Sequence, residues 1–318
     1  MKKNLSLAIL VVLLALAPVL ATGSSYIVSL LLLMLVYVIL TTGLNLVVGY
    51  CGQFSFAQGA FFGIGAYTAG IMSRDLHTGF WVHLPAGMIL AGLFGLLLGI
   101  PALRLKGHFL AIVTIAFQTI VYLGLVQWTS FTGGQNGLMV PPVGKVALFG
   151  ATLFTIEGLN SNYWMVLVAT VVLVFVAARL VKSRLGREWV AVRDDEVLAS
   201  AIGLNATRAK LTAFVASAAF AGAAGVMMAH YMGNITPDDY TIWISCTVVA
   251  MMIVGGRGTF YGPMLGVALL TLLPEMLGDF ARYRMLFFGV LLVLSIALLP
   301  EGIAGRMRKL REMKEAQP

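Results

Sequence analysis

The sequence predicts an all-α integral membrane protein with about ten transmembrane helices, some short or interrupted by glycine, and a further helix on the cytoplasmic surface. Composition is the first observation behind this prediction, because 60% of the 318 residues are hydrophobic and 11% are charged. A typical soluble domain carries about 25% charged residues, so the composition argues against a water-soluble globule. The other observations are a series of apolar runs and an uneven distribution of basic residues between them.

Apolar runs long enough to cross a bilayer recur through the chain. A span needs about 20 apolar residues to cross roughly 30 Å of hydrocarbon. The runs that meet or approach this length are residues 5–22, 26–48, 55–72, 85–103, 109–129, 163–181, 209–231, 241–256, 263–277 and 284–300. At a rise of about 1.5 Å per residue, the eighth and ninth reach only about 24 Å, so they need support from neighbouring helices.

The first run has two interpretations. Lys2 and Lys3 followed by an apolar stretch and small residues resemble a cleaved signal peptide, but the interpretation as a retained first span is favoured. In both cases the second span runs inward. The chain therefore divides into an N-terminal span at 1–24, a transmembrane domain at 25–300 that includes a charged cytoplasmic loop at 182–208, and a basic cytoplasmic tail at 301–318.

Basic residues give the orientation. With the N-terminus in the cytoplasm, the outer segments hold only Arg74, Lys145, Arg282 and Arg284, which leaves 17 of the 21 Lys and Arg on the cytoplasmic side. An excess of Lys and Arg marks cytoplasmic loops. The sequence thus predicts a multi-pass protein with both termini in the cytoplasm, and the net charge of +8 is explained without nucleic acid.

Two glycine-rich segments share a pattern. Residues 47–54 read VVGYCGQF and residues 253–260 read IVGGRGTF. Glycine-interrupted segments in corresponding halves indicate a translocation site, although tight helix packing or chance similarity explains the pattern as well. The candidate residues of a substrate path are Asn45, Gly49, Gly52, Gln53, Ser55, Gln58, Gly59, Gly255, Gly256 and Gly258.

The stretch from Arg179 to Lys210 holds seven of the 21 basic residues and four of the 13 acidic residues. Gly186 is expected to break the chain after the sixth span, and residues 188–202 are expected to form one short amphipathic helix. Its apolar face would carry Trp189, Val192, Ala199 and Ile202, whereas Arg193, Asp194 and Glu196 project elsewhere. Gly203 would cap this helix and Asn205 the next one. Such a helix is either a connector on the membrane surface or a coupling helix inserted into a partner protein.

Several motifs are absent from the sequence. It contains no phosphate-binding loop of the G-x-x-x-x-G-K-[ST] type and no H-E-x-x-H motif, so an enzyme is poorly supported. Cys51 and Cys246 have no metal-binding spacing. No charged residue lies in the middle of a predicted span, although ion-driven carriers usually need one. Energy for any transport is therefore expected to come from another chain.

The sequence resembles the permease subunits of branched-chain amino-acid ABC importers, of the LivM type. The resemblance runs from about residue 40 to 300 and is carried by GLNLVVGYCGQFSFAQGAFFGIGAY (43–67), PALRLKGHFLAIVTIAF (101–117), TGGQNGL (132–138), GREWVAVRDDEVLASAIGLNATRAKLTAF (186–214) and GGRGTFYGPMLG (255–266). It implies that the 186–203 segment docks onto an ATPase, through Gly186, Arg187, Trp189, Arg193, Asp194, Asp195, Glu196 and Gly203. The family's loop often carries Ala after Gly-Arg, where this chain has Glu188 and then Trp189.

The resemblance also implies the partners. These are two ATPase subunits, a second homologous permease subunit and a periplasmic or lipid-anchored amino-acid-binding protein, in the plasma (inner) membrane of a bacterium or archaeon. The chain itself would need no cofactor, because the ATPase subunits bind ATP. Relatives with a similar pattern import urea or other small polar compounds. The alternatives from other classes are an autonomous secondary carrier or channel and a membrane scaffold that transmits a signal.

Overall fold

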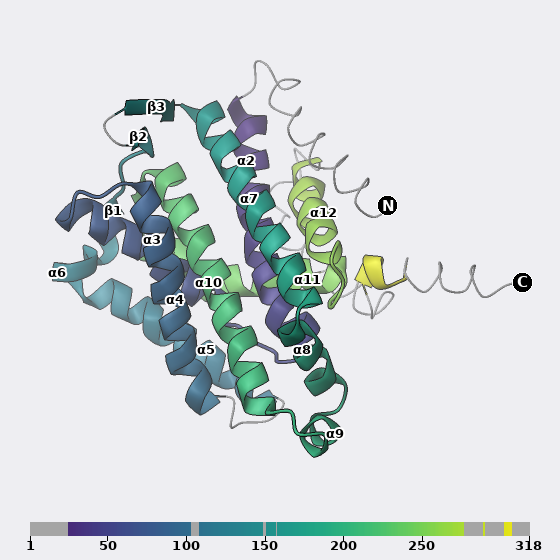
Figure 1. Cartoon of the computed structure of the whole chain (residues 1–318). Coiled ribbons are helices and arrows are strands. Elements are labelled where there is room, and N and C mark those ends of the chain that lie inside the picture. Colours follow the sequence, from purple (N-terminus) through teal and green to yellow (C-terminus); the bar gives the residue numbers. More distant parts are fainter. Residues whose placement is uncertain are drawn as a thin grey trace, which may run out of the picture.

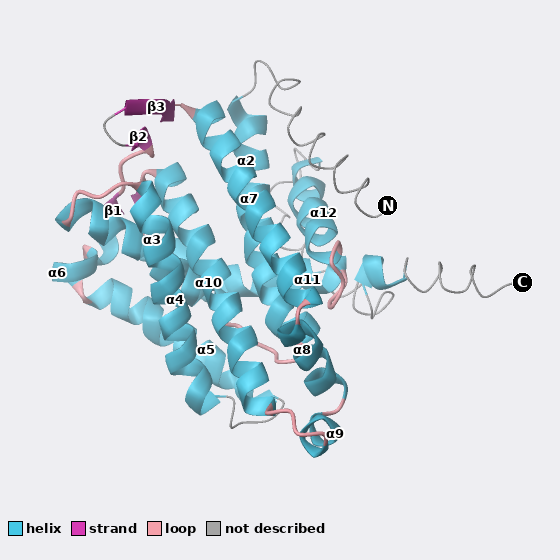
Figure 2. Cartoon of the chain, in the orientation of Figure 1, coloured by secondary structure: helices cyan, strands magenta, loops and turns pink. Residues whose placement is uncertain are grey.

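A computed structural model describes residues 25–102, 108–148, 151–156, 158–276, 289 and 302–306. The predicted N-terminal span at 5–22 lies outside these residues, as do most of the predicted last span at 284–300 and most of the basic tail. The described chain is a bundle of helices with short strands at one end (Figures 1 and 2).

The elements follow one another in this order. They are α2 (Ser25–Leu44), the π-helix η1 (Asn45–Tyr50), α3 (Gln58–Asp75), α4 (Phe80–Ala102), α5 (His108–Gln127), α6 (Thr129–Thr132), the 3₁₀-helix η2 (Gly134–Asn136), β1 (Leu138–Met139), β2 (Gly144–Leu148), β3 (Ala151–Ile156), α7 (Leu159–Lys182), α8 (Arg184–Asp194), α9 (Glu196–Ala201), α10 (Ala206–Met232), β4 (Asn234–Ile235), the 3₁₀-helix η3 (Pro237–Tyr240), α11 (Ile242–Gly255) and α12 (Gly262–Met276).

The described residues contain six helical stretches long and apolar enough to cross a membrane. They are Ser25–Tyr50, Phe80–Ala102, Phe109–Gln127, Leu159–Lys182, Ala206–Met232 and Pro237–Gly255. Each matches a predicted span. The predicted spans at 55–72 and 263–277 correspond to α3, which is less apolar and mostly buried, and to the short α12. The prediction of an all-α, multi-pass membrane protein is confirmed.

Strands occur only in the segments that join α5 to α7 and α10 to α11, as far as the described residues go. β1 pairs antiparallel with β4, and β2 with β3. The sequence between residues 130 and 162 is rich in Gly, Asn and Pro, which favours turns. Glycine is required at position 137, because φ is +72° there and an added Cβ would lie 1.9 Å from the Ile235 carbonyl oxygen of β4. These strands lie at one end of the bundle, and α9 lies at the opposite end (Figure 1). We call the end with the strands the strand end.

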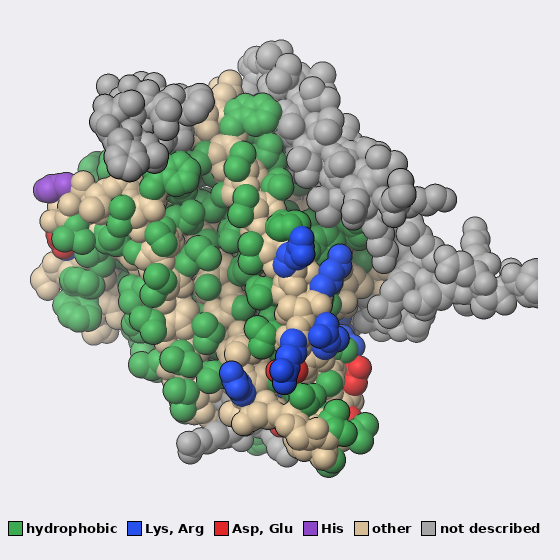
Figure 3. All heavy atoms as spheres, in the orientation of Figure 1, with side chains coloured by type: hydrophobic (Ala, Val, Ile, Leu, Met, Phe, Trp, Pro, Cys, Tyr) green, Lys and Arg blue, Asp and Glu red, His purple; other side chains and the backbone are tan. Residues whose placement is uncertain are grey.

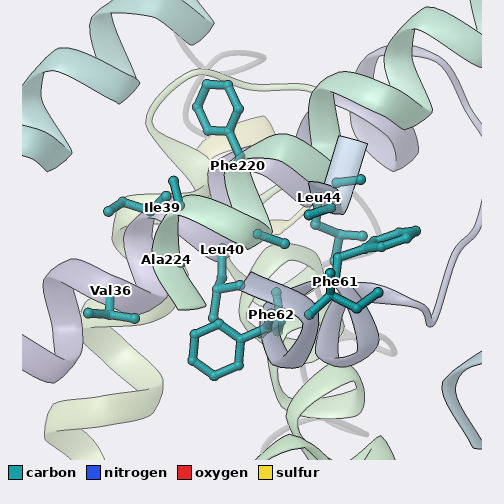
Figure 4. Close-up of a cluster of buried hydrophobic side chains, with 14 of the residues drawn as sticks. Val36, Ile39, Leu40, Leu44, Phe61, Phe62, Phe220 and Ala224 are labelled. Atoms are coloured by element: carbon teal, nitrogen blue, oxygen red, sulfur yellow. The ribbon is translucent and has the colours of Figure 1, made fainter. Parts of the chain in front are cut away.

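Glycines let α3, α4 and α10 pack closely. A Cβ at Gly65 would lie 2.1 Å from the Gly222 carbonyl oxygen, and a Cβ at Gly225 would lie 2.0 Å from the Phe62 carbonyl oxygen. Small residues at such positions allow helix backbones to approach, which is how membrane helices gain packing energy. The approach fixes α10 between α3 and α4, and side chains from α2, α3 and α10 fill the adjacent core (Figure 4).

A histidine pair joins α4 to α10 at the strand end. Nδ1 of His83 lies 2.9 Å from Nε2 of His230, and the two rings are stacked. Nδ1 of His230 lies 2.8 Å from the Pro141 carbonyl oxygen, and Nε2 of His83 lies 3.0 Å from Oγ1 of Thr78. Both imidazoles are buried. The pair thus ties two spans and the loop before β2 together.

Candidate functional site

The charged loop forms two helices where the sequence predicted one. α7 ends at Lys182, Ser183 is extended, and α8 begins at Arg184, so the chain turns three residues before Gly186. Gly186 lies inside α8, where an added Cβ would be 2.0 Å from the Val181 carbonyl oxygen. The prediction that Gly186 itself breaks the chain is wrong, but a glycine is needed there because α8 folds back tightly against the end of α7.

The predicted continuous helix at 188–202 is also wrong, because Asp195 interrupts it. Asp195 has extended backbone angles of φ −157° and ψ 109°. Its Oδ1 accepts hydrogen bonds from the amides of Val197, at 2.8 Å, and Leu198, at 2.9 Å. A carboxylate at this position satisfies amides that have no partner inside the helix. Asp195 therefore ends α8 and starts α9.

Replacing Asp195 by alanine is expected to destabilise α9 by about 1 kcal/mol, the typical cost of losing such a cap. The amides of Val197 and Leu198 would then exchange hydrogen with solvent several-fold faster, as measured by hydrogen–deuterium exchange. Asp194→Ala is the matched control, because the Asp194 carboxylate pairs only with the adjacent Arg193 on the surface. Equal exchange in the two variants would contradict the capping role.

The end of α9 and the start of α10 are as predicted. Gly203 has a φ of +87°. Its amide donates to the Ser200 carbonyl oxygen at 3.0 Å, and the Leu204 amide donates to the Ala199 carbonyl oxygen at 3.1 Å. This is the Schellman arrangement of a helix end. Oδ1 of Asn205 accepts from the Arg208 amide at 2.9 Å, so Asn205 caps α10.

The break at Asp195 changes which side chains face outward. Trp189, Val192 and Ala199 are buried as predicted, and the Trp189 Nε1 donates to Oγ1 of Thr212 on α10 at 3.0 Å. Ile202, however, is 70% exposed, contrary to the prediction. The reason is that the helical periodicity of α8 is interrupted at Asp195, so the buried face of α9 cannot be extrapolated from that of α8. On α9 and at its C-terminal cap, the exposed large apolar side chains are Val197 at 78%, Leu198 at 62% and Ile202 at 70%, and we call them the α9 apolar patch.

An ion pair braces α9 against α10. Nζ of Lys210 lies 2.7 Å from Oε1 of Glu196, and the Lys210 side chain is only 5% exposed. Glu196, predicted to contact a partner, thus serves at least in part to hold the loop. The sequence showed that both residues were charged, but a contact between residues in two separate helices leaves no local pattern.

Arg193 is exposed, in agreement with the prediction that it projects away from the apolar face, and its guanidinium also reaches the first glycine-rich segment. Its Nη1 donates to the Gly49 carbonyl oxygen of η1 at 3.0 Å. A Cβ on Gly52 would lie 2.7 Å from Cγ of Arg193, so the glycine makes room for the arginine stem. Arg193 therefore joins the charged loop to the first glycine-rich segment.

Asn45 joins the first glycine-rich segment to the second. Its Nδ2 donates to the Thr259 carbonyl oxygen at 2.9 Å, and its Oδ1 accepts from the Gly258 amide at 2.8 Å. A Cβ at Gly49 would lie 2.0 Å from Oδ1 of Asn45 and 2.5 Å from the Gly258 nitrogen. We call the cluster of Asn45, Gly49, Gly52, Arg193 and Gly258 the glycine junction.

The junction is built on a π-helix. Residues 45–50 have the wider π turn, which is frequent at functional sites. The structure thus brings the two segments with the shared pattern into contact and adds the charged loop to them. Gly255 and Gly256 lie deeper, where a Cβ at Gly255 would be 1.9 Å from the Gly262 carbonyl oxygen of α12.

Of the other predicted path residues, Gln58 and Gly59 belong to a separate polar cluster inside the bundle, whereas Ser55 and Gln53 make local contacts before α3. Nε2 of Gln58 donates to the Leu40 carbonyl oxygen at 3.1 Å, and its Oε1 accepts from Ser217 Oγ at 3.2 Å. The Gly59 amide donates to Ser245 Oγ at 2.8 Å. Ser55 is buried and accepts from the Ala57 amide, and Gln53 is half-buried.

Gln118 completes this cluster, although the sequence did not single it out. Its Nε2 donates to the Tyr240 carbonyl oxygen at 2.7 Å, and its Oε1 accepts from Ser245 Oγ at 3.3 Å. Polar groups buried among apolar helices need such partners. A glutamine within an apolar run was the available signal for Gln118.

The chain is similar to known proteins over most of its length. Residues 26–296 match the model of the family described as "Branched-chain amino acid transport system / permease component". The chain is 37% identical over 303 residues, 89% of its length and 71% of the relative's, to the high-affinity branched-chain amino acid transport system permease protein LivM of Salmonella typhimurium. It is 38% identical to LivM of Escherichia coli over 89% of the chain and 71% of the relative.

A second group of relatives is more distant. The permease protein LivH of the Escherichia coli system is 26% identical over 85% of the chain and 91% of its own length. No solved structure matches the chain. The match over most of the chain, together with the identity to the LivM proteins, shows that this chain belongs to the family of branched-chain amino acid transport system permease components.

Proposed function

We propose that this chain is a membrane-spanning permease subunit of an ATP-driven importer for branched-chain or related hydrophobic amino acids, and that it catalyses no reaction itself. The named transport systems of its relatives support the substrate class. The observation that carries the ATP-driven mechanism is the α9 apolar patch, which a rigid loop presents beyond the ends of the spans.

The α9 apolar patch is unusual because its surroundings are polar. Asp194 and Asp195 directly before α9 and Arg208 in the first turn of α10 are exposed, so charged residues flank the patch along the chain. Burying a large apolar side chain contributes about 1.5–3 kcal/mol, and exposed apolar groups with polar rims mark interaction sites. Because the Asp195 cap and the Lys210–Glu196 pair hold α9 in place, the patch is ready to bind. We assign it to an apolar groove of an ATPase subunit.

The orientation follows from this assignment. ATP is a cytoplasmic nucleotide, so the α8–α9 end lies in the cytoplasm and the strand end lies outside. Basic side chains gather over α7 and α8 on an otherwise apolar face (Figure 3), and Arg179, Lys182, Arg184 and Arg187 are exposed there. Basic residues at this end agree with the distribution expected of cytoplasmic segments.

The remaining partners come from the relatives. LivM and LivH are permease proteins of systems with the same description, which supports pairing of this chain with a second homologous permease subunit. Two ATPase subunits and an external amino-acid-binding protein would complete the importer. The glycine junction and the polar cluster around Gln58 and Gly59 are then the candidate parts of the substrate path between the permease subunits.

Docking through the α9 apolar patch is tested by introducing charge into it. In Leu198→Asp, desolvating the new carboxylate opposes binding, so co-purification of the ATPase subunits with the tagged chain from native membranes is expected to fall about tenfold or more, corresponding to at least ~1.4 kcal/mol. ATP-dependent amino-acid uptake by the whole complex in proteoliposomes falls with it. Thr207→Asp is the control, because Thr207 is exposed in the first turn of α10, where an acidic residue is favourable.

Two outcomes would overturn the proposal. If Leu198→Asp retains the ATPase subunits as fully as Thr207→Asp, the patch is not the docking surface. If the purified chain alone moves amino acids in liposomes and the rate follows an ion gradient, the protein is a secondary carrier.

A further inference from the structure

We propose that Arg193 is a positioning residue that transmits the movement of α8 directly into both glycine-rich segments, through the glycine junction. The inference rests on the proposed function and deepens it, since it names the contact through which an ATPase-driven movement reaches the spans. The resemblance implies that Arg193 belongs to the docking segment, and the structure adds a contact between its guanidinium and η1.

The first argument is that Arg193 occupies the point where three elements meet. It lies in the last turn of α8, its Nη1 binds the Gly49 carbonyl of η1, and the same Nη1 is 3.1 Å from the position of a Cβ on Gly258 in the α11–α12 turn. Gly49 lies near the end of a helix, where carbonyl oxygens lack donors within the helix. The guanidinium supplies such a donor from another part of the chain.

The second argument is that the atoms of the junction lie in close contact. Added Cβ atoms at Gly49, Gly52 and Gly258 would each lie 2.9 Å or less from a neighbouring atom of the junction, namely Asn45 Oδ1, Arg193 Cγ and the Gly49 carbonyl oxygen. Arg193 and Gly52 are exposed, whereas Asn45 and Gly49 are buried, and closely packed interiors transmit strain. Movement of the Arg193 guanidinium, which is bonded to the Gly49 carbonyl, is therefore passed to the buried side of the junction.

The third argument is that Asn45 makes the two glycine-rich segments move together. Its amide both donates to the α11–α12 turn and accepts from it, through Thr259 and Gly258. Movement of η1 is thereby passed to the turn between α11 and α12 in the same step. At its other side, α8 is held to α10 by Trp189 and Thr212. This arrangement gives α8 a fixed side on α10 and a transmitting side on η1.

The test uses the complete importer in proteoliposomes and measures amino-acid uptake per ATP hydrolysed. In Arg193→Met the side-chain volume is largely kept and the donor is lost. We expect the ATPase subunits to remain bound and ATP hydrolysis to continue, while uptake per ATP falls about tenfold because the two processes are uncoupled. Arg193→Lys, which keeps a cationic donor, is expected to restore part of the ratio. Arg184→Met on the same helix is the matched control, since within the described part of the chain Arg184 pairs with Glu188 alone and its side chain is 85% exposed.

A second variant tests the far side of the junction. Asn45→Asp keeps the acceptor for the Gly258 amide but replaces the donor to Thr259 with an oxygen, and it is expected to lower uptake per ATP in the same way. If Arg193→Met lowers uptake and ATP hydrolysis in parallel, or leaves their ratio equal to that of Arg184→Met, Arg193 transmits nothing. If Arg193→Met does not assemble, an Asn45→Asp ratio equal to that of the unmodified complex overturns the inference. Failure of the unmodified chain to bind an ATPase would instead refute the proposed function.

Discussion

Gly225→Ala is expected to lower the stability of the folded chain by about 2–3 kcal/mol, in the upper range of overpacking substitutions. The added Cβ would lie 2.0 Å from the Phe62 carbonyl oxygen and 2.8 Å from the Ala66 nitrogen. Both are backbone atoms of α3, which have no rotamer to change, so α3 and α10 must separate. Thermal unfolding of the detergent-solubilised chain, followed by the loss of monodisperse protein, measures the effect.

Gly92→Ala on α4 is the matched control for this substitution. It makes the same gain in helix propensity, about 1 kcal/mol. Its Cβ would lie 3.6 Å from the nearest atom, a methyl group of Val215, which is ordinary contact. We expect Gly92→Ala to be as stable as the unmodified chain or more so. Equal unfolding temperatures for the two variants would show that α3 and α10 do not depend on close backbone approach.

Glu196→Gln is expected to release α9 from α10. It removes the charge that compensates Lys210, whose side chain is almost completely buried. Breaking a fully buried ion pair costs about 3–5 kcal/mol, because the remaining charge has no partner. The Glu196 side chain is 40% exposed, so solvent screens the pair and about 1–2 kcal/mol is expected here. Hydrogen–deuterium exchange across residues 196–205 would become correspondingly faster.

Glu188→Gln is the control for this prediction, and a double variant is its reversal. Glu188 pairs with Arg184, whose side chain is 85% exposed, and such a pair contributes only about 0.2–0.5 kcal/mol. Lys210→Met in the Glu196→Gln background removes the remaining charge, and we expect it to restore slow exchange. If the double variant exchanges as fast as Glu196→Gln, the brace is not electrostatic.

The sequence predicted the helices of this fold better than their contacts. Apolar runs predict spans because the bilayer demands length and apolarity, and the caps at Gly203 and Asn205 were predicted because glycine and asparagine satisfy local backbone requirements. The break at Asp195 was missed although Asp-Asp-Glu is a typical start of a helix. Because residues 188–202 were treated as one helix, Ile202 was wrongly assigned to the buried face.

In the candidate site, the sequence predicted the segments but not all the contacts between them. The two glycine-rich segments were found by their shared spacing, and the structure places them against each other through Asn45. The contact between Arg193 and η1 was not predictable, because it depends on the space that Gly52 leaves in another element. Reversing the charge of Arg193 and Asp195 together, an obvious test of docking from the sequence alone, would therefore disturb the glycine junction and the α9 cap before it altered any partner contact.

In the histidine pair at the strand end, the neighbouring groups determine which ring nitrogen donates and which accepts each hydrogen bond. The Pro141 carbonyl can only accept, so Nδ1 of His230 carries a proton and its Nε2 is left as the acceptor for Nδ1–H of His83. The His83 Nε2 in turn accepts from the Thr78 hydroxyl. Each ring thus holds one proton, at a nitrogen that its neighbours assign. A second proton on His230 would set two N–H groups against each other, so α4, α10 and the Pro141 loop stay joined in this way only while the His230 imidazole is neutral.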